Sequence, residues 1–443
     1  MRRLAILTIL LVIPAPGAVA EGDAAPEVLR LTLAGALERA RAVSASLHAL
    51  DADVRAAEAN IRMAAADRRP GVEVSGGYSR LSNVPELALD LPDGSRRVIF
   101  PNVQDWWSAQ LAARYPLYAG GRLAALRSTA REEAEAAHDD RRTGEIDLEL
   151  EVTSAYWSLV TARETERVLA EALLAYEAHL VDARNRETVG LAARDEVLAV
   201  QVERDRAELN RIRAGNAADL AAADLGRLLD LPAGQRVEPT DPLEPAIVPQ
   251  LDAEELARRA LDDRPERRAL ESRIAAAASH VDVERAARLP HVELNGGWVY
   301  ANPNPRVLPL SAAWDDTWFV GAAVAFQVFD GGRARASQAR AEARTDSLQQ
   351  RLEDLDRRIR FDVTARVLEV RNAAAAVPVA ERGVDAAREN LKVSRDRYRE
   401  GVIPSSELLD AEVALQRAGL DRAETLARLR LALAGLRRAV GGA

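Results

Sequence analysis

The sequence lacks cysteine altogether and is poor in aromatic residues. With no cysteine among its 443 residues, disulfides, thiolate metal sites and a cysteine nucleophile are excluded. Aromatic residues make up 4% of the chain and apolar residues 48%, a mixture that favours long alanine-rich helices over a compact aromatic core. After the first 20 residues no run of about 18 apolar residues occurs, so we expect no membrane-spanning helix. Any part that enters a membrane must then do so as strands.

Positive charge is also in deficit, because 60 Lys and Arg residues face 69 Asp and Glu residues and the formal net charge is −9. This balance argues against a general affinity for nucleic acid. No nucleophile is seen beside a base, and the two Gly-Gly-Arg motifs lack the Lys-Ser/Thr of a phosphate-binding loop. We therefore expect neither an enzyme nor a cofactor or metal. Five histidines without a second ligand at metal spacing are expected on the surface: His48, His138, His179, His280 and His291.

The N-terminus has the pattern of an export signal. Arg2 and Arg3 precede an apolar run over residues 4–13, and the small residues Ala18 and Ala20 precede Glu21. A charged segment, a short apolar segment and a small-x-small site predict a signal peptide over residues 1–20. Because no cysteine follows this site, we expect no lipid anchor on the mature N-terminus.

The chain repeats itself. Residues 70–78 match residues 290–298 at an offset of 220, and Gly120-Gly121-Arg122 matches Gly331-Gly332-Arg333 at an offset of 211. We therefore divide the mature chain into a first repeat (21–231), a linker (232–250) and a second repeat (251–443). Five prolines in the linker exclude a continuous helix there.

Each repeat contains the pattern helix, strand, loop, strand, long helix, turn, helix. Within the first long helix, apolar residues recur at alternating steps of three and four from Val152 to Leu180, which indicates a coiled coil. A helix of about 66 residues is about 100 Å long, and a compact monomer cannot bury it, so partners are needed. Two shorter helices stacked end to end reach nearly the same length. Helices are expected over residues 32–68, 122–188, 195–229, 252–288, 333–399 and 405–440.

Between the helices the apolar period changes from 3.6 to two, which predicts strands over residues 70–80, 107–118, 290–300 and 318–328. The segments 70–118 and 290–329 hold 13 of the 18 aromatic residues. Aromatic residues at strand ends are typical of a membrane barrel, whereas the alternative is a soluble sheet packed on the helices. Four strands cannot close a barrel. Two copies of the chain supply eight strands and three supply twelve.

This order of elements, doubled at a constant offset, resembles the outer membrane efflux protein family, the TolC-like channels. The resemblance implies a mainly α fold with a membrane β-barrel part: a homotrimer with a twelve-stranded barrel in outer-membrane lipid and a twelve-rod helical tunnel in the periplasm. It also implies a passive exit duct for efflux or type I secretion, joined through a periplasmic adaptor to an inner-membrane pump or ABC exporter. The alternative is a periplasmic coiled-coil scaffold or adaptor without a membrane barrel.

The resemblance implies two sites. The tips of the helical hairpins contact the adaptor in the family, and here they are Val189, Gly190, Leu191, Gly401 and Val402. Glycine suits such turns because it tolerates a left-handed backbone, so these residues are alternatively helix terminators only.

The second implied site is the periplasmic aperture. Glu407 and Asp410 match the acidic pair that narrows the pore, and Tyr398 and Glu196 match its closing network. Alternatively, the two acids merely complement the helix dipole, with Ser405 as the cap. Where the family has an arginine that bonds between the helices, this chain has Ile403, so that bond is absent or built differently.

Overall fold

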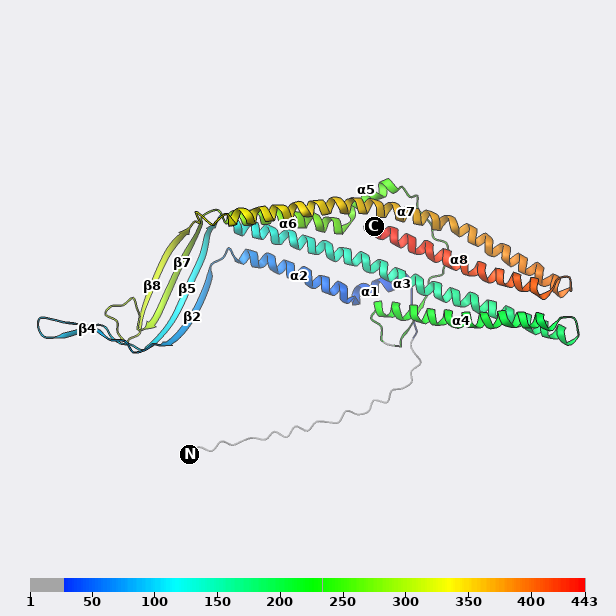
Figure 1. The fold of residues 1–443 in the computed structure, drawn as a ribbon, viewed down its shortest axis with the longest axis horizontal. Helices are drawn as coiled ribbons and strands as arrows, with labels where there is room; N and C mark the ends of the chain where they lie inside the picture. Colours follow the sequence, from blue (N-terminus) through cyan, green and yellow to red (C-terminus); the bar gives the residue numbers. More distant parts are fainter. Residues whose placement is uncertain (1–27, 233, 443) are drawn as a thin grey trace, which may run out of the picture.

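The computed structural model describes residues 28–232 and 234–442, so the predicted signal peptide lies outside the described residues. The molecule is elongated (Figure 1). One end is a twisted sheet and the opposite end carries the turns of two helical hairpins. Long helices lie side by side along the axis between these ends.

Two helices of 67 residues form the body, α3 (Arg122–Thr188) and α7 (Arg333–Arg399). Each turns back into a helix of 35 residues, α4 (Arg194–Leu228) and α8 (Ser405–Ala439). The predicted bounds of all four helices are confirmed to within one residue. Among the described residues, no helix is both long and apolar enough to cross a membrane.

The opening helix of each repeat is broken, which corrects the single helices expected over 32–68 and 252–288. The first divides into α1 (Leu33–Val43) and α2 (Ala45–Ala66), and the second into α5 (Ala253–Asp263) and α6 (Pro265–Ala286). At Ser44 the backbone turns extended, and its hydroxyl accepts from Leu47 N at 3.3 Å to cap α2. At Arg264 the backbone is extended because proline follows.

In each repeat a hydrogen bond joins the broken opening helix to the end of the closing helix. Arg39 of α1 donates from Nε to the carbonyl oxygen of Leu229 at 3.0 Å, just after α4 ends. In the second repeat, Arg264 donates from Nε to the carbonyl oxygen of Ala439 at 2.6 Å, where α8 ends. Both arginines donate a hydrogen bond to a carbonyl oxygen at a helix C-terminus, where the backbone carbonyls have no N–H partner within the helix.

The sheet continues the helices. Its strands are β2 (Gly71–Arg80), β5 (Asp105–Ala119), β7 (His291–Asn302) and β8 (Asp315–Ala325), antiparallel in the order β2-β5-β7-β8. The helices that adjoin them pack in the order α2, α3, α6, α7. The predicted strands are all present, although β8 begins and ends three residues earlier than expected.

Two pairs of short strands were not predicted. The loop after β2 holds a small hairpin, β3 (Leu87–Asp90) and β4 (Arg96–Phe100). The linker holds β6 (Arg236–Pro239), which pairs in parallel with β1 (Val28–Leu31) at the start of the chain. These strands are four or five residues long, too short to show a period of two above the noise of the sequence.

The core lies at mid-length, where α1, α3, α7, α8 and the linker meet. Its largest fully buried side chains include Tyr156, Leu159 and Ile359. The Tyr156 hydroxyl lies 2.8 Å from Asp241 Oδ2 and accepts from the Asp241 backbone N–H at 3.1 Å, which ties the linker to α3. Burial raises the pKa of Tyr156 to about 12.

Candidate aperture and hairpin tips

The two hairpin turns have the same backbone geometry. Gly190 and Gly401 have φ angles of 77° and 75°, in the left-handed region that side chains with a Cβ disfavour. The following residues close each turn: Leu191 N donates to Arg186 O at 2.8 Å, and Val402 N donates to Arg397 O at 2.9 Å. These are the hydrogen bonds of a glycine helix C-cap.

Apolar side chains surround both turns at the tip of the molecule. Val189, Leu191 and Val402 are 68%, 76% and 66% exposed. A helix terminator requires only the glycine, and three large apolar side chains in solvent have no stabilising role within one subunit. Figure 1 shows both tips at the same end, far from the sheet.

The predicted acidic pair lies on the first turns of α8. Glu407 and Asp410 are both exposed, whereas Leu408 and Ala411 between and after them are buried against α7. Within the described part of the chain, neither carboxylate has an ion-pair partner. The structure thus places both acids on the solvent side of α8, one helical turn apart.

The other two predicted aperture residues lie close to each other. Tyr398, the penultimate residue of α7, is buried in a small cluster with Leu408. Burial raises the pKa of Tyr398; the positive charge of Arg186 opposes this shift, and the carboxylates of Asp182 and Glu196 add to it. Glu196 is half-buried in the first turn of α4. The Tyr398 hydroxyl has no hydrogen-bond partner among the described residues.

Arg186 makes the contact between hairpins that Ile403 cannot make. Its guanidinium lies 4.1 Å from the centre of the Tyr398 ring, a cation–π distance, and donates to Arg399 O at 3.3 Å. Arg186 was not predicted, because no motif marks it and its contact with Tyr398 arises only when the two hairpins pack together. Ile403 instead packs against the apolar cluster of Tyr398 and Leu408.

Three further polar residues link α3 to α8, and they correct two expectations. His179 was expected on the surface but is only 4% exposed. Its Nδ1 lies 2.9 Å from Glu412 Oε2 and its Nε2 lies 3.0 Å from Ser405 Oγ, so a hydroxyl does lie beside a base. Ser405 is also not a helix cap, since Pro404 occupies that position. Ser405 and Glu412 are 1% and 5% exposed, so substrate cannot reach them.

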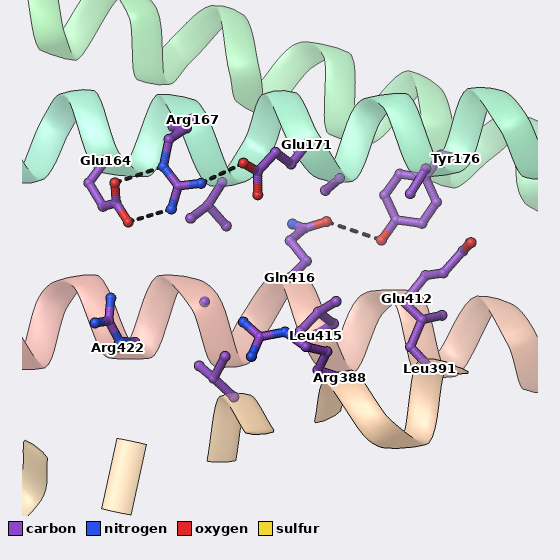
Figure 2. Close-up of a pocket in the computed structure, with 15 residues that line it drawn as sticks. Glu164, Arg167, Glu171, Tyr176, Arg388, Leu391, Glu412, Leu415, Gln416 and Arg422 are labelled. Atoms are coloured by element: carbon purple, nitrogen blue, oxygen red, sulfur yellow. Dashed lines mark hydrogen bonds and ion pairs between the residues drawn. The ribbon is translucent and has the colours of Figure 1, made fainter. Parts of the chain in front are cut away.

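A cavity of about 250 Å³ lies next to this group, between α3, α7 and α8 (Figure 2). Arg167 on its wall is paired with Glu164 at 2.7 Å and Glu171 at 2.5 Å. At its other end Tyr176 donates to Gln416 Oε1 at 3.0 Å, a second polar link between α3 and α8. No group of three or more His, Asp or Glu residues suited to a metal ion occurs in the described ranges.

Comparison with known proteins identifies the family. The model of the outer membrane efflux protein family matches residues 36–230 and 256–442, one match for each repeat. The chain belongs to this family. It is 26% identical to the outer membrane protein OprJ of Pseudomonas aeruginosa over 393 residues, covering 85% of this chain and 77% of OprJ. It is 25% identical to the toluene efflux pump outer membrane protein TtgC of Pseudomonas putida over 363 residues, covering 78% of this chain and 70% of TtgC.

The fold agrees with this assignment. The outer membrane protein VceC of Vibrio cholerae superposes with a TM-score of 0.77 at 21% identity, over 93% of this chain and 96% of VceC. The efflux protein described here is therefore a TolC-like, tandemly duplicated channel component of the outer membrane with a long periplasmic extension. Its family conducts efflux and performs no catalysis.

Proposed function

We propose that three copies of this efflux protein close into one duct, and that the duct narrows at Glu407 and Asp410. The proposal assigns the hairpin tips to a periplasmic adaptor, which in turn contacts an inner-membrane pump or ABC exporter. The observation that carries it is the pair of unpartnered apolar faces on the two outermost helices.

In the half of the molecule near the tips, the helices lie in the order α4, α3, α8, α7, so α4 and α7 are outermost (Figure 1). Helix α4 buries Val200, Ala207 and Ala214 against its own subunit. At about 100° per residue, the opposite face of α4 carries an apolar stripe that is exposed. We call it the α4 stripe; it comprises Leu198, Val202, Leu209, Ile212 and Leu220.

Helix α7 has the matching feature. It buries Val363, Val370 and Val377 within the subunit. The opposite face carries the α7 stripe, which comprises Phe361, Leu368, Val379 and Val393, all exposed. Both stripes become buried when the α4 stripe of one subunit packs on the α7 stripe of the next. Such a contact joins two different surfaces, and repeating it around an axis forms a closed ring.

The sheet supports the same closure. Strands β2 and β8 are its two edges, and among the described residues each pairs with a strand on one side only. Their exposed residues include Val74, Trp318 and Val320. Pairing β2 of one copy with β8 of the next satisfies both edges, and three copies of a four-stranded sheet give twelve strands.

Three copies also bring six carboxylates of Glu407 and Asp410 around one axis. Like charges at close range repel one another and attract cations. The aperture is therefore expected to hold cations and to pass them in preference to anions. Exposed Val189, Leu191 and Val402 give the adaptor apolar contacts at the same end of the duct.

Conductance in planar bilayers tests the aperture. We expect Glu407→Ala with Asp410→Ala to raise single-channel conductance, because the shorter side chains widen the opening. Block by divalent cations should weaken, because the carboxylates that attract cations are removed. The matched control is Asp421→Ala with Glu424→Ala. These acids are also three residues apart and exposed, and they lie 14 residues further along the same face of α8.

If the two double substitutions change conductance and cation block equally, the effect comes from the overall negative charge of the duct. The aperture is then not formed by Glu407 and Asp410. A mature protein that stays soluble without detergent and forms no channel would instead support the periplasmic scaffold.

A further inference from the structure

The side chain of His179 bridges α3 to two turns of α8. Its Nδ1 is 2.9 Å from Glu412 and its Nε2 is 3.0 Å from Ser405. Ser405 and Glu412 are seven residues apart and therefore lie on one face of α8. The segment of α8 between them carries Glu407 and Asp410 on its exposed face. One imidazole thus fixes the part of the helix that carries the proposed aperture.

The hydrogen-bond partners of the His179 imidazole determine which of its nitrogens carries the hydrogen. An ionised Glu412 accepts only, so Nδ1 carries a hydrogen and donates to it, and Nε2 accepts from the Ser405 hydroxyl. When the imidazole gains a second proton, Nε2 becomes a donor to Ser405 Oγ. The Ser405 hydrogen then needs another acceptor. The neighbouring Tyr398 hydroxyl, which has no hydrogen-bond partner among the described residues, supplies one.

Burial strengthens the attraction between a protonated His179 and Glu412. His179 and Glu412 are almost completely shielded from solvent, with 1% and 3% of their side chains exposed. A charged imidazole beside a carboxylate attracts it far more strongly here than at the surface. Glu412 on α8 is the charged group in direct contact with His179, and the Tyr398 ring on α7 lies 5.3 Å from the imidazole. The charged groups that act on the adjacent Tyr398 and Tyr176 are Asp182 and Arg186 on α3, Glu196, Glu203 and Arg206 on α4, and Glu412 on α8.

We propose that His179 is a positioning residue for the aperture, and that its protonation in mildly acidic solution tightens the contact between α3 and the first two turns of α8. Acidification from about pH 8 to about pH 5, the range in which histidine changes charge, then holds the aperture closed. This inference rests on the proposed function for its effect on conductance, but the contact itself does not depend on it.

The substitution His179→Gln separates protonation from hydrogen bonding. The glutamine amide N–H donates to Glu412 and its carbonyl oxygen accepts from Ser405, yet the side chain gains no proton. The matched control is His138→Gln, which removes a histidine of the same helix that is 43% exposed and faces Glu58. His179→Ala removes both bonds and reports the loss of the contact.

The first readout is the mobility of a nitroxide at Ser406→Cys, next to Ser405 on the exposed side of α8. The chain has no other cysteine, so the label is unique. We expect the label to be less mobile at about pH 5 than at about pH 8 in the wild-type background and after His138→Gln. We expect no such pH response after His179→Gln, and high mobility at both pH values after His179→Ala.

The second readout is conductance at the same pH values. Glu407 and Asp410 are unchanged in all these variants, so the pH response that is lost on His179→Gln belongs to His179. A label that responds to pH in the same way before and after the substitution His179→Gln overturns the proposal. If the label responds as expected but conductance does not change, the pH-dependent contact between α3 and α8 is supported and the assignment of the aperture to Glu407 and Asp410 is contradicted.

Discussion

At the scale of single residues, Tyr156 ties the linker to the first repeat. Its hydroxyl contacts Asp241 in the linker and lies 3.1 Å from the carbonyl oxygen of Leu31 in β1. Asp241 also accepts from Leu33 N at 2.7 Å. One phenol therefore joins α3, the linker and the first helix at the centre of the core.

Replacing this phenol tests its contribution. We expect Tyr156→Phe to lower the free energy of unfolding by about 1–3 kcal/mol, because the Asp241 backbone N–H and carboxylate lose a buried partner. Denaturant unfolding in detergent measures the change. Tyr118→Phe is the control, since that ring is exposed on β5; a comparable loss in both variants would refute the assignment.

The same residue gives a pH dependence with a definite sign. The pKa of Tyr156 is raised to about 12 in the folded chain, against about 10 for an exposed tyrosine. The folded state then holds the proton more tightly than the unfolded state. This contribution is complete below about pH 10 and is lost as the pH rises toward about 12. Unfolding series from about pH 9 to about pH 12 should show a steeper decline for the wild type than for Tyr156→Phe.

Residue partners were the least predictable part of the site. Ser405 and Glu412 lie 226 and 233 residues from His179, and Arg186 lies 213 residues from Arg399. The internal repeat relates equivalent positions of the two halves, but it does not indicate which side chains of one half contact the other. The exposed acids Glu407 and Asp410, in contrast, follow from their place in the first turns of a helix whose start the sequence marks.

At the scale of elements, the turns of the two hairpins depend on backbone conformation alone. A Cβ added at Gly190 or Gly401 meets no atom within 4 Å, so only the positive φ opposes a side chain. We expect Gly190→Ala and Gly401→Ala each to destabilise the protein by about 1–2 kcal/mol, measured by thermal unfolding.

Gly383 provides a control at which alanine is expected to stabilise the protein rather than destabilise it. It is exposed within α7, has no neighbour within 4 Å of a Cβ, and has an ordinary helical φ. Alanine there should stabilise the helix by about 0.5–1 kcal/mol. Equal effects at all three positions would mean that the turns are not held in the left-handed conformation.

Element boundaries were predictable where composition changes sharply. The Gly-Gly pairs begin α3 and α7, and the glycine turns end them, so both long helices agree with the prediction. The breaks at Ser44 and Arg264 were missed because the apolar period continues across them. Both breaks nevertheless have a local signal, the capping hydroxyl of Ser44 and the proline after Arg264.

At the scale of the whole molecule, the α4 stripe tests the assembly. We expect Val202→Glu with Leu209→Glu to convert the proposed trimer to monomers in detergent, because two charges then face the apolar α7 stripe of the next subunit. Light scattering coupled to size exclusion measures the mass. The control is Ala199→Glu with Ala217→Glu, which places the same charges on exposed positions of α4 outside the stripe. A trimer that survives the stripe substitutions contradicts this interface.

The sequence by itself determined the duplicated architecture, the long helices, the four main strands and the need for partners. These features follow from local periodicity, from proline and glycine positions, and from the apolar surface that one copy leaves exposed. Only the tertiary structure decided the helix order, the pairing of β1 with the linker, and the contacts of His179 and Arg186. Those contacts join residues of different repeats, and their partners are set by how the helices pack rather than by spacing along the chain.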